Sequence, residues 1–200
     1  MLEQPLDEET PVAQLRSALH GDNDQQRMDA IRLLRRAGDG ALKLVLTDLQ
    51  DSMRTVRSTA AWELGMIGAP AAIDGLVKAM ADTHEDVRVN AAWALGHIHD
   101  SRAVPALASA LADDPVADVR QASAAALGRI AHASGLPALR GALRDEDWLV
   151  REAAAEAIGA AGFTDGVEAL EDALTDGSKR VRKAAAAALR RIHQQADSED

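Results

Sequence analysis

A Val-Arg pair, followed by alanines and then by an apolar residue and glycine, returns along this chain every 31 or 32 residues. The pairs begin at Val56, Val87, Val119, Val150 and Val181. A fixed period of this length is typical of supersecondary units that stack, because one unit cannot bury its apolar face alone. The repeat therefore restricts the fold to an array of similar units.

A second apolar pattern lies between these pairs, as in Val104, Leu107 and Leu111. Spacings of three and four residues mark one face of a helix. Each such segment ends at an aspartate five residues before the next valine, where a carboxylate can accept hydrogen bonds from the free N–H groups that begin the following helix. These aspartates are Asp51, Asp82, Asp114, Asp145 and Asp176.

The chain is 47% apolar but only 2% aromatic, a composition that favours packed helices over strands. We predict an all-α fold of six helix pairs in a single repeat domain over residues 10–194. Helix A is expected at about 10–20, 40–50, 70–81, 102–112, 134–144 and 165–175. Helix B is expected at about 24–37, 53–67, 85–98, 116–131, 148–161 and 179–193. The corresponding units are about 10–38, 39–69, 70–100, 101–132, 133–163 and 164–194.

The two ends of the array depart from the pattern. Gln25 and Gln26 are expected to replace Val-Arg in the first unit, and Arg190 replaces glycine in the last. Such changes suit capping repeats, which expose one face to water. The acidic segments 1–9 and 195–200 are expected to fray.

Charge and composition exclude several classes of function. The formal net charge of −10 disfavours nucleic acid as a partner, and the absence of cysteine excludes disulfides and thiolate metal sites. No apolar stretch is long enough to span a membrane, and the N-terminus lacks the features of a signal peptide. We therefore expect a cytoplasmic protein that binds neither nucleic acid nor membrane.

The repeated units read Val-Arg-x-x-Ala-Ala-x-x-Leu-Gly, preceded by the turn aspartate. They resemble HEAT-like repeats of the phycobilin-lyase type, and the resemblance covers roughly residues 10–193. The resemblance implies a right-handed, armadillo-like α-solenoid with the B helices on its concave face. Members of this group include protein-binding scaffolds, subunits that act on bilin chromophores, deoxyhypusine hydroxylases and DNA glycosylases. The resemblance is therefore specific for fold and leaves function open.

All three tryptophans fall on the side of helix B that faces away from its core. At about 100° per residue, Trp62 and Trp93 lie almost opposite the apolar stripe of their helices, and Trp148 lies at the margin of the outward side. Exposed tryptophans are typical anchors of protein interfaces, although rings here can instead cover neighbouring helices. The predicted partner-binding residues are Trp62, Trp93, Trp148, Arg54, Ser58, Thr59, Glu85, Val89, Asn90, Gln121, Glu152 and Glu156.

The repeated arginines and the histidines offer two competing interpretations. The arginines could bind phosphate, but ion pairs to the turn aspartates, linking one repeat to the next, explain them better. A deoxyhypusine hydroxylase would need His-Glu pairs before the Ala-Ala run, where this chain has, for example, Ser58-Thr59 and Val89-Asn90. We therefore expect no metal site and no cofactor.

These features favour a non-catalytic scaffold or adaptor that binds a partner protein or an extended peptide along the B-helix face. Self-association through this face stays open. The alternative is an enzyme or enzyme subunit, either a bilin lyase subunit or, less favoured, a metal-dependent oxidoreductase similar to deoxyhypusine hydroxylase.

Overall fold

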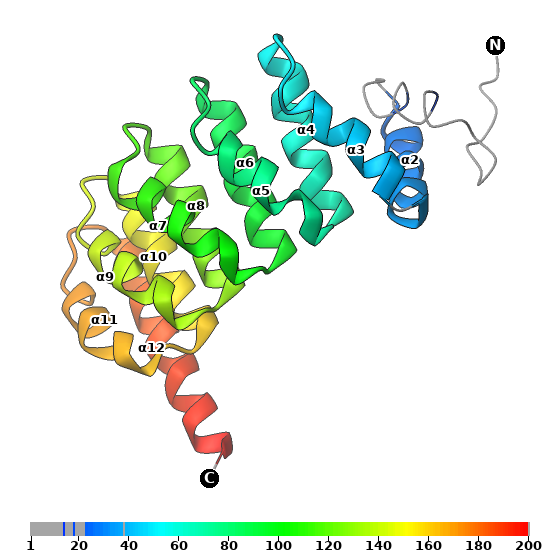
Figure 1. Cartoon of the computed structure of the whole chain (residues 1–200). Coiled ribbons are helices and arrows are strands. Elements are labelled where there is room, and N and C mark those ends of the chain that lie inside the picture. Colours follow the sequence, from blue (N-terminus) through cyan, green and yellow to red (C-terminus); the bar gives the residue numbers. More distant parts are fainter. Residues whose placement is uncertain (1–13, 15–17, 19–22, 38, 200) are drawn as a thin grey trace. The chain divides into compact units, whose positions relative to one another are not determined.

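The computed structural model describes residues 14, 18, 23–37 and 39–199, and all regular secondary structure in this part of the chain is helical (Figure 1). This is the α-solenoid fold predicted from the repeat. Two compact units are present, one up to Ala94 and one from Leu95 onwards. The first helix A, expected at 10–20, lies outside the described residues except for Gln14 and Ala18.

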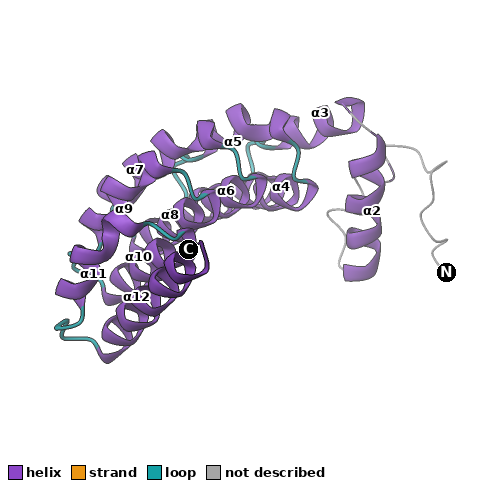
Figure 2. Cartoon of the chain, turned by 90° about the horizontal axis from the view of Figure 1, so that it is seen from below, coloured by secondary structure: helices purple, strands orange, loops and turns teal. Residues whose placement is uncertain are grey.

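The first unit contains α2 (Asp24–Ala37), α3 (Asp39–Asp48), α4 (Arg54–Ile67), α5 (Ile73–Ala79) and most of α6 (Glu85–Ile98). Helices α3 and α5 form one layer and α4 and α6 the other (Figure 2). The core between the layers is built from the apolar stripes of both, with Leu64, Ile73 and Leu76 at most 1% exposed.

The second unit repeats this arrangement with α7 (Val104–Asp113), α8 (Ala117–Ile130), α9 (Leu136–Ala142), α10 (Trp148–Ala161), α11 (Val167–Ala173) and α12 (Lys179–Glu199). The A helices α7, α9 and α11 form one layer and the B helices α8, α10 and α12 the other (Figure 2). Leu107, Leu139, Ile158 and Leu170 are completely buried between the layers.

The B helices follow their predicted bounds closely, whereas two details differ. Four A helices begin with a separate 3₁₀ turn, at Pro70–Ala72, Ser101–Ala103, Ala133–Gly135 and Thr164–Gly166. The last helix continues to Glu199, six residues beyond its predicted end at 193. No glycine or proline follows Gly177, so nothing in the local sequence ends α12 earlier.

The glycine of each repeat lets successive B helices approach closely. A Cβ added to Gly128 in α8 would lie 2.6 Å from the Cα and Cβ of Ala157 in α10. The equivalent distances to the nearest atom are 2.8 Å for Gly96 against Ala126 and 2.5 Å for Gly159 against Ala188. Any side chain at these positions would overlap the backbone of the next helix, which explains why glycine recurs with the repeat.

The first repeat, which contains α2, is in a different register from the predicted one. Asn23 caps α2, since its Oδ1 accepts a hydrogen bond from the Gln26 amide at 3.1 Å. The next amide, that of Arg27, donates to the Asn23 carbonyl, just as the Arg57 amide donates to the Met53 carbonyl. Arg27 therefore occupies the repeat-arginine position, and the prediction of Gln25 and Gln26 at the Val-Arg positions was wrong by one residue.

Candidate functional site

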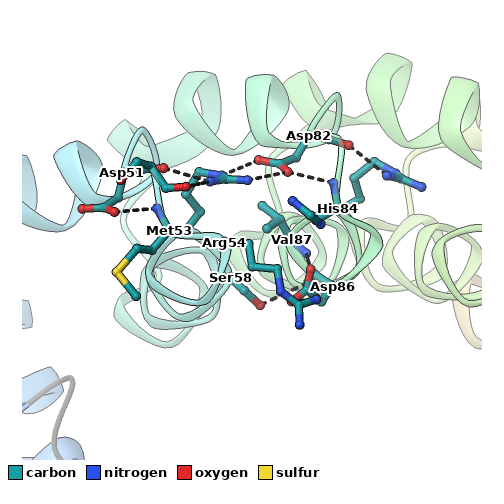
Figure 3. A network of polar contacts seen from close by, with 11 residues as sticks. Asp51, Met53, Arg54, Ser58, Asp82, His84, Asp86 and Val87 are labelled. Atoms are coloured by element: carbon teal, nitrogen blue, oxygen red, sulfur yellow. Dashed lines mark hydrogen bonds and ion pairs between the residues drawn. The ribbon is translucent and has the colours of Figure 1, made fainter.

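The repeated arginines connect consecutive turns. In the first unit, Arg57 Nε and Nη2 lie 2.7 Å and 3.0 Å from the two carboxylate oxygens of Asp82, while Nη1 donates to the Asp51 carbonyl at 2.8 Å. The bound Arg57 guanidinium is the main reason that the pKa of the Asp82 carboxyl is held below its usual range. Figure 3 shows the turns of Asp51 and Asp82 side by side, joined by this guanidinium.

The second unit contains the same bridge twice. Arg120 binds both carboxylate oxygens of Asp145, at 2.8 Å and 2.9 Å, and Arg151 binds those of Asp176, at 2.8 Å and 3.1 Å. Arg182 keeps the local half of the pattern, with Nη1 donating to the carbonyls of Asp176 and Gly177. The prediction that the repeat arginines tie one repeat to the next is confirmed for Arg57, Arg120 and Arg151, whose guanidiniums are occupied by carboxylates.

The turn aspartates also hold the backbone that enters each B helix. Each accepts a hydrogen bond from the amide two residues later, which belongs to the residue immediately before the helix. The donor amides are those of Met53, His84, Val116, Asp147 and Ser178. The prediction that these aspartates bind the first amides of the B helices was therefore wrong by one residue, because each carboxylate holds the amide that precedes its helix.

Two indole rings lie together on the B helices of the first unit. Trp62 in α4 and Trp93 in α6 are stacked, with ring centroids 6.4 Å apart and an angle of 19° between the planes. Both side chains are partly exposed. Trp93 also has a packing role, because a Cβ at Gly65 would lie 2.7 Å from its Cζ3 atom. The pair therefore both covers α4 and presents aromatic surface to solvent.

Polar side chains next to these rings link α4 to α6. Asn90 Nδ2 donates to the Ser58 hydroxyl at 2.8 Å, and this hydroxyl donates to the Asp86 carbonyl at 3.4 Å. The Arg54 guanidinium lies 3.7 Å from the Asp86 carboxylate (Figure 3). Ser58 and Asn90 thus have structural partners, while Arg54 and Glu85 are exposed.

A tryptophan and an arginine lie together on α10 and α12. The Trp148 side chain is 37% exposed, and the guanidinium carbon of Arg180 lies 4.9 Å from the centre of its ring, within the range of a cation–π contact. Arg180 Nε also donates to Glu152 Oε1 at 3.0 Å. Glu156 follows one turn later on α10 and is exposed.

None of the twelve predicted partner-binding residues is buried. The structure brings together Trp62, Trp93, Ser58, Asn90 and Arg54 in the first unit. In the second unit it joins Trp148 to Glu152 through Arg180. Thr59, Val89 and Gln121 are partly exposed, and within the described residues no hydrogen bond or ion pair joins their side chains to either group.

Sequence reasoning missed one unusual residue, Glu63 in α4. Its side chain is completely buried, and neither carboxylate oxygen has a hydrogen-bond partner among the described residues. Burial, followed by the nearby charge of Asp48, raises the pKa of Glu63 to about 8, although Arg27 acts in the opposite direction. Its position in the repeat could have indicated burial, because the equivalent residues in later repeats are small and apolar. They are Ala94, Ala126, Ala157 and Ala188.

The described part of the chain contains neither a cluster of metal-binding side chains nor a helix that could span a membrane. No three His, Asp or Glu side chains there are grouped so that they could hold a metal ion. No helix there is both long and apolar enough to cross a membrane.

The geometry can be compared with known structures. A chain in the complex of CpcE and CpcF of phycocyanin lyase from Nostoc sp. PCC7120 is 32% identical, with a TM-score of 0.68 over 76% of this chain and 65% of its own length. This chain therefore spans slightly less than two thirds of that protein. No curated protein sequence matches this chain.

Two more distant structures share the fold. YibA of Escherichia coli is 23% identical, with a TM-score of 0.68 over 96% of this chain and 76% of its own. A designed armadillo repeat protein in complex with the peptide (KR)4 is 22% identical, with a TM-score of 0.63 over 92% of this chain and all of its own. The model of HEAT repeats matches residues 12–88, 44–128, 73–159 and 110–190, so this chain belongs to the HEAT repeat family.

Proposed function

We propose that this chain is a non-catalytic scaffold that binds a partner protein or peptide through the side chains of its B helices. The main support is that all three indoles lie on these helices and keep part of their surface exposed to solvent. Tryptophan and arginine are among the residues that most often anchor protein interfaces, and an indole buries a large apolar area while its N–H can still bind a partner. The stacked pair Trp62–Trp93 is the proposed anchor in the first unit.

The second unit supports the same proposal with a mixed polar and aromatic surface. Arg180 is held by Trp148 and Glu152, so its side chain is already ordered before a partner arrives. Ordering a long side chain in advance lowers the entropic cost of binding. Glu156 extends this surface along α10, as expected for contacts with a partner of complementary charge.

Two of the similar structures are complexes. The phycocyanin lyase structure is a complex of CpcE with CpcF, and the armadillo design is a complex with a peptide. These likenesses make a protein or peptide partner the natural first candidate for this chain, whose repeats have the same architecture.

The test compares partner capture by the wild-type protein and by Trp62→Ala/Trp93→Ala and Trp148→Ala/Glu152→Ala variants. Asp74→Ala/Lys78→Ala is a matched control, because both residues are exposed on α5 in the other layer. We expect loss of an interface anchor to weaken binding by ~2 kcal/mol, or roughly thirtyfold. Equal capture by the wild type and both tryptophan variants, with retained helicity, would refute binding through this face.

A second candidate is a subunit of a bilin lyase. It is favoured by one observation, the 32% identity to a chain of the phycocyanin lyase complex. Titrating the purified protein into a free bilin and recording the visible absorbance tests it directly. A shift of the chromophore band supports this candidate, and an unchanged spectrum leaves the scaffold as the proposal.

A further inference from the structure

A shallow pocket of about 400 Å³ lies between α10 and α12 on the B-helix layer of the second unit. Its floor consists of small residues, and Glu156 and Arg191 stand at its edge. The lining residues are Glu156, Gly159, Ala160, Ala184, Ala187, Ala188 and Arg191.

The repeat explains why a pocket forms here. The residue six positions after each repeat valine is Trp62 in α4 and Trp93 in α6, where indoles cover the helices. The same position is Glu156 in α10 and Ala187 in α12. Because Ala187 is small, the space that an indole fills in the first unit is left open in the second unit. An incoming side chain can therefore occupy the position of a repeat tryptophan.

The charges at the edge define what fits. Glu156 and Arg191 are exposed, and neither forms an ion pair or a side-chain hydrogen bond with any described residue. Glu156 lies six residues after the repeat valine of α10, whereas Arg191 lies ten residues after the repeat valine of α12. Because these helices are parallel, Arg191 is nearer to their C-terminal ends. The pocket thus has an acidic side towards the helix N-termini and a basic side towards the C-termini.

We propose that this pocket binds a segment of a partner protein that inserts one large apolar side chain between a basic and an acidic residue. The apolar side chain covers the alanine floor, its basic neighbour pairs with Glu156 and its acidic neighbour pairs with Arg191. Small-molecule sites enclose most of the surface of their ligand. This open pocket, lined mainly by alanines, can instead cover one side chain of a peptide. This inference rests on the proposed function and adds the chemistry of the partner.

The probe is a random peptide library displayed on phage, selected against the wild-type protein and against a Glu156→Arg/Arg191→Glu variant. We expect wild-type selections to enrich peptides with an apolar residue between a basic and an acidic one. The charge-reversed variant is expected to enrich peptides in which the basic and acidic neighbours are exchanged. The same sequence preference with both proteins, or no enrichment with the wild type, would overturn the proposal.

A filled pocket provides the second arm. Ala187→Gln adds a side chain into the pocket, and Ala125→Gln is its matched control, because Ala125 is exposed at the same repeat position in α8. For a selected peptide labelled with a fluorophore, Ala187→Gln is expected to raise the dissociation constant at least tenfold and Ala125→Gln to leave it unchanged. Equal binding by both variants contradicts the pocket. Partner capture that depends on the tryptophans but not on Ala187 would retain the proposed function and reject this inference.

Discussion

Gly128 in α8 is in such close contact with Ala157 in α10 that an added Cβ would lie 2.6 Å from both the Cα and the Cβ of that alanine. The Gly128→Ala variant must therefore push the two helices apart. We expect the free energy of unfolding to fall by about 1–3 kcal/mol, the usual cost of overpacking a tight core. Urea denaturation followed by circular dichroism measures the change.

Gly141 in α9 is the matched control for this substitution. It is also helical, but a Cβ there would meet nothing within 4 Å. Gly141→Ala should raise the free energy of unfolding by about 0.5–1 kcal/mol, because alanine reduces the entropy of the unfolded chain. Similar destabilisation by both variants would show that close helix contact is not the reason for the repeated glycine.

The Arg151–Asp176 bridge should stabilise the second unit in a pH-dependent way. Arg151 is the main reason that the pKa of the Asp176 carboxyl is lowered from 3.8. A lowered pKa means that the stabilisation is complete above this value and is lost as the pH falls below it. Arg151→Ala should cost about 1.5–3 kcal/mol near neutral pH, and the difference from wild type should shrink in acid.

Arg182→Ala separates the bridge from the local contacts of the same arginine. Arg182 donates to two backbone carbonyls as Arg151 does, but no described carboxylate binds it. We expect its replacement to cost less than half as much as that of Arg151. Equal losses, with no dependence on pH, would indicate that the backbone contacts alone hold the turns.

Buried Glu63 predicts the opposite pH dependence. Because its pKa is raised from 4.5 to about 8, the folded protein holds the proton in this range after the unfolded chain has released it. The free energy of unfolding should therefore fall, on the order of a few kcal/mol in total, as the pH rises from about 4.5 to about 8. Glu63→Gln, which carries no titratable group, should flatten this slope in denaturation curves recorded at several pH values.

The control for Glu63 is Glu168→Gln, since Glu168 is exposed on α11. Removing its charge should leave the pH dependence of unfolding as in the wild type. If the wild-type protein is equally stable across this pH range, Glu63 is ionised in both states or reaches solvent, and the buried neutral acid is refuted.

The repeat gave the fold with little ambiguity, because each physical requirement occurs several times in the chain. The glycines that contact Ala126, Ala157 and Ala188 recur at a fixed spacing in the sequence. The arginines that bind the next turn recur in the same way, each 25 residues before its aspartate. The first repeat lacks this redundancy. Arg27 lies 30 residues before Arg57, one fewer than the usual spacing, and Gln26 replaces valine, so the register became clear only from the Asn23 cap.

The candidate site was partly readable for the same reason. Helical periodicity placed Trp62 and Trp93 together, and they stack. It could not place Arg180 on Trp148, because that contact depends on side-chain conformations across two helices. Nor did it find Glu63 buried, because a glutamate is expected at the surface and the only sign of burial is that it replaces an alanine of the later repeats, such as Ala94 and Ala126.

The stacked indoles provide a test of the first unit that does not need a partner. Two rings 6.4 Å apart and 19° from parallel couple electronically, so the far-ultraviolet circular dichroism should contain an exciton couplet. Trp62→Phe and Trp93→Phe should each abolish the couplet, whereas Trp148→Phe, which removes a ring held by Arg180, should not. Because the Trp93 ring also covers Gly65, Trp93→Ala should reduce the free energy of unfolding more than Trp62→Ala, by about 1 kcal/mol or more. A couplet that persists in both single variants would show that the two rings do not stack in solution, and the proposed anchor would have to be sought elsewhere on the B helices.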